Sequence, residues 1–104
     1  MTPQIPRAFL VYECQDYFQD RWPDDGLLDE ALQMLIIVPL NEVYEMKELG
    51  FLAVGRSGVD GIDFGYRKHH SGLWAFYPIE QEFKFMADSI QVLVDGWCSG
   101  RLSV

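Results

Sequence analysis

The chain has 104 residues, of which 49% are hydrophobic and 14% aromatic, and it carries a formal net charge of -8 at pH 7. This length corresponds to one domain with a single core, and a composition this apolar excludes intrinsic disorder. No apolar run approaches the roughly 20 residues that a membrane-spanning helix needs. The N-terminal residues do not resemble a secretion signal, so we expect a cytoplasmic protein.

The acidic residues are concentrated in the first half of the chain. Residues 1–48 hold ten acidic and three basic residues, a net charge of -7, whereas residues 49–104 hold six and five, a net charge of -1. This excess of carboxylates argues against binding to nucleic acid or to an anionic membrane, because both need Lys and Arg. It is compatible with a basic protein partner, although solubility alone also explains an acidic surface.

The N-terminal segment has the pattern of an amphipathic helix. Residues 7–22 predict a helix that begins after Pro6, which suits a first helical turn because it lacks a backbone N–H. We expect this helix to end before Pro23, and residues 24–26 to form a turn. A strand over residues 8–12 remains an alternative.

Residues 27–48 combine helical and strand signals. Residues 27–33 predict a short helix, and residues 34–38 predict a strand rich in β-branched residues that ends at Pro39. Asn41 is then expected to cap a second short helix over residues 42–48.

Residues 51–77 carry the clearest β-structure signal. Three short strands are predicted, joined by glycine-rich turns, and apolar residues alternate with polar or small ones over residues 62–67. The Asp60-Gly61 pair tolerates the positive φ angles of a tight hairpin turn. The third of these strands is expected over residues 73–77, and one further strand over residues 81–85.

The end of the chain predicts a helix over residues 90–97, because four apolar residues there recur at i, i+3, i+4 and i+7. Asp88 or Ser89 is expected to cap this helix, and Gly96 and Gly100 to end it. Together these elements predict an α+β fold. It would be a single antiparallel β-sheet of about four to six strands, with helices from both ends of the chain packed on it.

The chain holds few residues that could perform catalysis. His69 and His70 are expected in a surface loop, where adjacent residues point apart and chelate a metal poorly together. Cys14 and Cys98 are expected to be buried free thiols. The sequence has no phosphate-binding, calcium-binding or nucleophile motif. We therefore expect no enzyme, no cofactor and no metal site, and a small enzyme is the least favoured reading.

Four segments, in their order along the chain, resemble the SUKH superfamily, which includes yeast Smi/Knr-type cell-wall regulators and many bacterial immunity proteins. They are IIVPLNEV at 36–43, FLAVGRSGVDGIDFGYR at 51–67, the W-x-x-Y-P-I pattern at 74–79, and MADSIQVLVDGW at 86–97. The usual opening of the family, a Trp-containing helix followed by a Leu-Pro motif, is shortened or replaced in this chain.

The resemblance implies a single SUKH-like domain over residues 1–104 that binds a protein rather than performing catalysis. Bacterial members neutralise a cognate toxin, often a nuclease, that neighbouring cells deliver. A basic toxin domain suits an acidic inhibitor whose carboxylates take the place of substrate phosphates. A regulatory or scaffolding module of the same fold is the alternative. Neither the sequence nor the resemblance indicates the oligomeric state.

The partner-binding surface is expected on the acidic first half of the chain. The chosen residues are Glu13, Asp16, Asp20, Asp24 and Asp25. On a continuous helix, the first three would share one face, because they are spaced at i, i+3 and i+7. The choice rests on charge alone, and an ordinary solvated helix face would show the same pattern.

Overall fold

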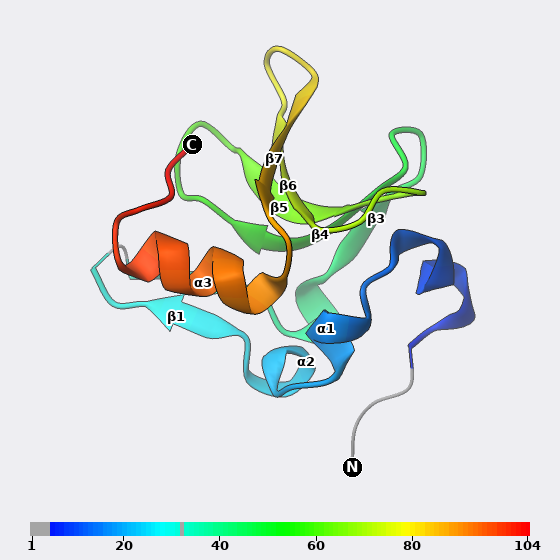
Figure 1. The fold of residues 1–104 in the computed structure, drawn as a ribbon, viewed down its shortest axis with the longest axis horizontal. Helices are drawn as coiled ribbons and strands as arrows, with labels where there is room; N and C mark the ends of the chain where they lie inside the picture. Colours follow the sequence, from blue (N-terminus) through cyan, green and yellow to red (C-terminus); the bar gives the residue numbers. More distant parts are fainter. Residues whose placement is uncertain (1–4, 32) are drawn as a thin grey trace.

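In the computed structural model, which describes residues 5–31 and 33–104, helical segments cover one side of a seven-stranded antiparallel sheet (Figure 1). The predicted α+β class is confirmed, with one strand more than the expected range. The helical segments are η1 (Arg7–Tyr12), α1 (Gln15–Phe18), α2 (Trp22–Asp25), η2 (Leu40–Glu42) and α3 (Ile90–Cys98). The strands are β1 (Leu27–Asp29), β2 (Met34–Ile37), β3 (Tyr44–Met46), β4 (Phe51–Arg56), β5 (Asp63–Arg67), β6 (Leu73–Tyr77) and β7 (Glu82–Ala87).

Strand β4 lies at the centre of the sheet, whose order is β1-β2-β4-β5-β6-β7. One edge of β4 pairs with β5, and two short strands share the other edge. On that edge β2 pairs at Gly55 and β3 pairs over residues 51–53. Pro39 follows β2 and has no backbone N–H to donate, so the edge is interrupted there and resumes with β3. From β4 to β7 each strand pairs with the next one in the chain.

The turn between β4 and β5 is the tight hairpin that the Asp-Gly pair predicts. Asp60 has φ 52° and Gly61 has φ 72°, so both central residues lie in the left-handed region. The N–H of Ile62 donates to the carbonyl of Val59 at 2.9 Å, which closes the turn. This geometry matches the type I′ turn, whose twist suits the flanking strands.

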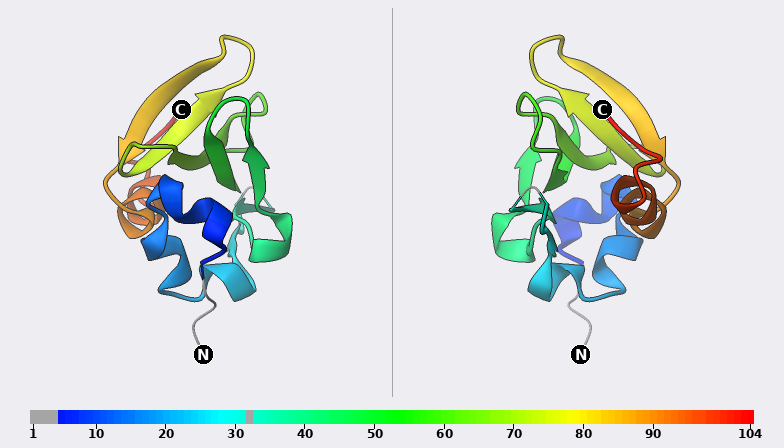
Figure 2. Two further views of the ribbon diagram at one scale, coloured as in Figure 1. Left: turned by 90° about the vertical axis from the view of Figure 1, so that its right-hand side faces the viewer. Right: turned by 90° about the vertical axis from the view of Figure 1, so that its left-hand side faces the viewer.

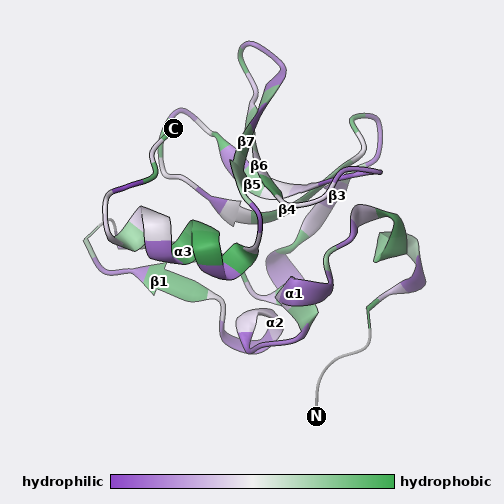
Figure 3. Cartoon of the chain, in the orientation of Figure 1, coloured by the Kyte–Doolittle hydropathy of each residue, from purple (hydrophilic) through white to green (hydrophobic). Residues whose placement is uncertain are grey.

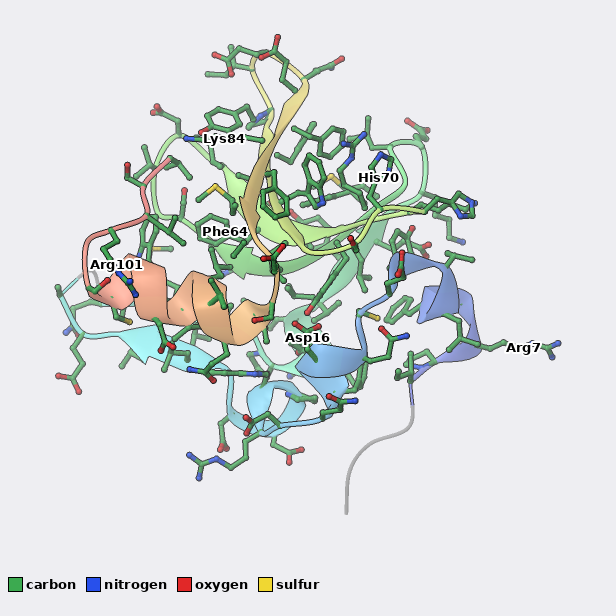
Figure 4. The ribbon with its side chains drawn as sticks, viewed as in Figure 1. Arg7, Asp16, Phe64, His70, Lys84 and Arg101 are labelled. Atoms are coloured by element: carbon green, nitrogen blue, oxygen red, sulfur yellow. The ribbon has the colours of Figure 1, made fainter. Side chains whose placement is uncertain are left out.

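The core lies between the sheet and the helical segments (Figure 2). Phe64 and Tyr66 of β5 are buried on this side, as the alternation along the strand predicts. Phe64 points toward α3, where its ring lies 5.4 Å from the ring of Trp97 (Figure 4). Tyr17 of α1 is fully buried, and its hydroxyl donates to the carbonyl of Val38 at 2.7 Å. This hydrogen bond attaches the N-terminal helices to the strands.

The prediction of one helix over residues 7–22 is wrong, as is the alternative strand over 8–12. The chain forms η1, α1 and α2 instead, and the break after η1 falls at Glu13, whose φ is 51°. Pro23 lies in the first turn of α2, a position that tolerates proline, rather than beyond the end of a helix. Three short pieces let the segment curve around the core, which a straight helix could not do.

The two short helices predicted in the middle of the chain are also wrong. Residues 27–29 form β1, which pairs with β2, and residues 44–46 form β3, which pairs with β4. Residue 32, within the first predicted helix, lies outside the described residues. Asn41 caps nothing, since it falls inside the 3₁₀ segment η2. Pairing with a neighbouring strand satisfies the backbone of such short segments, so weak helical preference is overridden.

The C-terminal helix is confirmed, with one difference in detail. Ser89, one of the two expected caps, provides the cap, since its hydroxyl accepts a hydrogen bond from the N–H of Val92 at 3.2 Å. Gly96 lies inside the helix rather than at its end, and a Cβ at this position would lie 2.5 Å from the side chain of Leu102. The absence of a side chain at Gly96 therefore lets the C-terminal segment fold back against α3.

The two cysteines differ in exposure. Cys14 is buried, as expected, and burial raises the pKa of its thiol to about 11. Cys98 is exposed, so the prediction of a buried thiol there is wrong. Cys98 is the last residue of α3, and the helix is already only partly buried at Trp97 before it.

We therefore expect the native protein to show one reactive thiol per chain toward Ellman's reagent at pH 8, and two in guanidinium chloride. The fast-reacting thiol belongs to Cys98, so the Cys98→Ser variant should show almost no reaction while it is folded. Two fast-reacting thiols in the native wild-type protein would contradict the burial of Cys14.

The Gly61→Val substitution should lower the free energy of unfolding by more than about 1 kcal/mol, because a β-branched residue does not tolerate positive φ. The added Cβ would meet only Pro78, at an ordinary 3.7 Å, so the loss comes from the backbone. Thermal unfolding measures the effect, with Gly61→Asn as the control that tolerates this conformation. Equal melting temperatures for wild type and Gly61→Val would contradict this role of the turn.

Candidate protein-binding surfaces

Four of the five acidic residues chosen from the sequence are exposed. They lie around α1 and α2, on the side of the molecule opposite the β6–β7 hairpin (Figure 1). Because the predicted helix is broken, turns rather than a common helical face place them in this region. We call the set the acidic surface: Glu13, Asp20, Asp24 and Asp25.

Asp16, the fifth residue, is occupied within the protein and does not belong to this surface. One carboxylate oxygen accepts hydrogen bonds from the hydroxyl of Tyr66 at 2.7 Å and the N–H of Tyr17 at 3.1 Å. The other accepts from the N–H of Ile90, also at 2.7 Å. Asp16 therefore joins α1 to β5 and to the first turn of α3 (Figure 4). The expectation that Asp16 is an exposed contact is not met, because only its spacing, and not its buried partners, was visible in the sequence.

The environment of Tyr66 keeps this connection intact at ordinary pH. Burial, together with the charge of Asp16, raises the pKa of the Tyr66 hydroxyl well above its usual value. The hydroxyl therefore stays protonated and continues to donate to the carboxylate. A hydrogen bond to a charged acceptor in a buried site is among the stronger contacts in a protein.

The acidic surface borders a shallow pocket of about 260 Å³. Its lining includes Asp20, Trp22 and Asp25, together with Gln91 from α3. Arg21 lies 3.9 Å from Asp25, but both side chains are largely exposed, so the ion pair contributes little to stability. Four acidic residues and this one arginine leave the surface with a net charge of -3.

The described residues do not assemble a metal centre. No group of three or more His, Cys, Asp or Glu side chains among them could hold a metal ion. His69 and His70 are both exposed at the turn that follows β5, as expected. Tyr44 donates a hydrogen bond to Asp63, and burial raises the pKa of this carboxyl group. Within residues 5–31 and 33–104, no helix is long and apolar enough to cross a membrane.

The face of the sheet that points away from the helices carries a second set of clustered side chains. We call it the open face: Tyr44, Met46, Phe51, Arg67, Trp74, Phe76, Phe83 and Phe85. The Phe76 and Phe83 rings lie 5.1 Å apart, and the Trp74 and Phe85 rings lie 5.3 Å apart. The hydropathy colours show apolar residues on both strands of the β6–β7 hairpin (Figure 3). Sequence analysis did not single out this face, although aromatic residues alternate along both strands.

The chain was compared with protein-family models, with curated proteins and with solved structures, and none of the three comparisons found a match. The resemblance to the SUKH superfamily therefore stays a prediction from the order of its motifs. The function has to be argued from the surfaces of this chain.

The Asp16→Ala substitution should lower the free energy of unfolding by about 2–3 kcal/mol, because it leaves the Tyr66 hydroxyl and the Ile90 N–H without their charged acceptor. Asp24→Ala, which removes an exposed carboxylate from the same region, should change it by less than about 0.5 kcal/mol. Denaturant unfolding of both variants measures the difference. Equal stability of the two variants would show that the hydrogen bonds of Asp16 do not stabilise the fold.

Proposed function

We propose that this protein is a non-enzymatic, protein-binding domain that acts in the cytoplasm and neutralises a basic bacterial toxin by stoichiometric binding. The acidic surface is the observation on which the proposal rests, since it has four exposed carboxylates and only one arginine beside them. The resemblance to the SUKH superfamily supplies the class of partner. A nuclease is the toxin class that best fits, because its substrate groove is basic.

The charge of the acidic surface explains how binding would inhibit such a toxin. Opposite fields speed the encounter of two proteins, and carboxylates that enter a basic groove exclude the phosphates of the substrate. Asp20 and Asp25 lie at the rim of the pocket beside Trp22, so charge and apolar area are adjacent there. Interface centres are enriched in aromatic residues and surrounded by a polar rim, so Trp22 would lie at the centre of this contact and the two carboxylates at its rim.

The alternative is a regulatory or scaffolding module. The observation that favours it is the open face, which lies on another side of the molecule and differs from the acidic surface in chemistry. A domain with two unlike surfaces can hold two partners at once. The acidic surface would then bind a basic protein without blocking an activity.

The proposal is tested by co-expressing the chain with the product of a toxin-like gene from its genomic neighbourhood. We expect a one-to-one complex, protection of the cells, and affinity that falls as salt is raised. A variant with Glu13→Gln, Asp20→Asn, Asp24→Asn and Asp25→Asn should bind at least tenfold more weakly.

The matched control neutralises four exposed carboxylates outside the acidic surface, by Glu48→Gln, Asp60→Asn, Glu80→Gln and Glu82→Gln. This variant should retain most of the affinity, because it changes the net charge equally without changing the acidic surface. If no complex forms and the toxin kills regardless of the chain, neutralisation is wrong. A complex without protection would favour the scaffolding alternative.

A further inference from the structure

Arg67 occupies an unusual position at the centre of the open face. Its guanidinium lies 4.6 Å from the centre of the Trp74 ring and 4.3 Å from that of the Phe83 ring. The residue is half-buried, and among the described residues its guanidinium forms no ion pair and no hydrogen bond. Two aromatic rings therefore hold a cation in place while all five of its N–H donors remain without a protein acceptor.

Further basic groups surround this arginine at one end of the sheet. Lys68 follows it, and the N–H of Lys68 donates to the carbonyl of Gly50 in the β3–β4 turn, which also contains Lys47. The His70 ring lies 5.6 Å from the Trp74 ring, among the side chains between the β3–β4 and β6–β7 hairpins (Figure 4). Glu48, in the same turn as Lys47, is exposed too, so this end combines basic side chains with a carboxylate.

The aromatic residues beside Arg67 are partly available to a partner. Phe85 is 47% exposed although it packs edge-to-face against Trp74, and Tyr44 is 42% exposed at the opposite side of the face. Phe51 and Phe76 beneath them are buried, so they support the face without being accessible. The accessible part therefore combines a fixed cation with apolar area next to it.

We propose that the open face binds an acidic segment of a partner protein, in which an apolar side chain lies next to the carboxylate. A carboxylate of that segment accepts hydrogen bonds from the Arg67 guanidinium, with Lys68 adding to the attraction, and a neighbouring apolar side chain packs on Phe85. Charge complementarity determines the choice, because a fixed arginine with free donors suits a carboxylate. This site is separate from the acidic surface and does not depend on the proposed function.

Single-stranded nucleic acid is the other anionic polymer that aromatic and basic residues can bind. Two observations argue against it. The net charge of -8 opposes a polyanion along most of the molecular surface. Arg67, His70 and Phe85 already pack around the Trp74 ring, so its faces are not free for stacked bases. A short segment with one or two carboxylates avoids both problems.

The test uses a phage library of random dodecapeptides, selected against the immobilised full chain at low ionic strength. We expect the enriched peptides to carry Asp or Glu beside an aromatic or aliphatic residue. A synthetic copy should bind Arg67→Gln and Lys68→Glu chains at least tenfold more weakly than the wild type. Phe85→Ser should weaken it as well, and because Lys68 and Phe85 are exposed, these two variants test the site even if Arg67→Gln unfolds.

Arg101→Gln is the matched control, because it removes an exposed arginine beyond α3 and should leave the affinity unchanged. The variant that neutralises the acidic surface should also bind the peptide as well as the wild type, which separates this test from that of the proposed function. The proposal is overturned by any of three results. These are no enrichment over the bare support, peptides that bind Arg67→Gln equally well, or tighter binding of a dT dodecamer than of any selected peptide.

Discussion

The carboxylate of Asp16 connects the N-terminal helical segments to β5 and α3, which are distant from them in the sequence. It accepts hydrogen bonds from β5 and from the first turn of α3, residues that lie 50 and 74 positions away in the sequence. The helical segments before β1 are only a few residues long and cannot be stable alone. They are positioned by this carboxylate and by the buried Tyr17, whose hydroxyl bonds to Val38.

The sequence predicted the sheet better than it predicted the helical layer. Residues 51–77 alternate with a period of two and contain an Asp-Gly turn, and both signals are local, so β4, β5, β6 and the hairpin were all foreseen. The prediction of one N-terminal helix failed although the apolar residues there do have helical spacing. Glu13 adopts a positive φ, which breaks the helix. Strands β1 and β3 were not predicted, because each is three residues long and forms only by pairing with a neighbouring strand.

The surfaces were predictable only in part, since exposure depends on contacts that are distant in the sequence. Glu13, Asp20, Asp24 and Asp25 are exposed as expected, but Asp16 has the same spacing and a structural role. The stacking of Arg67 between rings from β6 and β7 follows from strand register. That register depends on the type and length of the turns that join β5, β6 and β7, and the sequence analysis predicted these strands without their register. The result is a protein with clustered carboxylates on one side and, on another, an arginine held between two aromatic rings.

The order of the strands also has a consequence for how the molecule opens. From β4 to β7 each strand pairs with the next one, so these contacts join residues that are close in the sequence. The hydrogen bonds of Asp16 to Tyr66 and Ile90 join residues that are 50 and 74 positions apart. Short loops close faster, so we expect the hairpins to assemble first and the N-terminal helices to dock last and detach most readily. The acidic surface lies on those late helices, while the open face lies on the early hairpins. A partner on the acidic surface would therefore hold the detachable layer in place, and one on the open face would leave its motion unchanged.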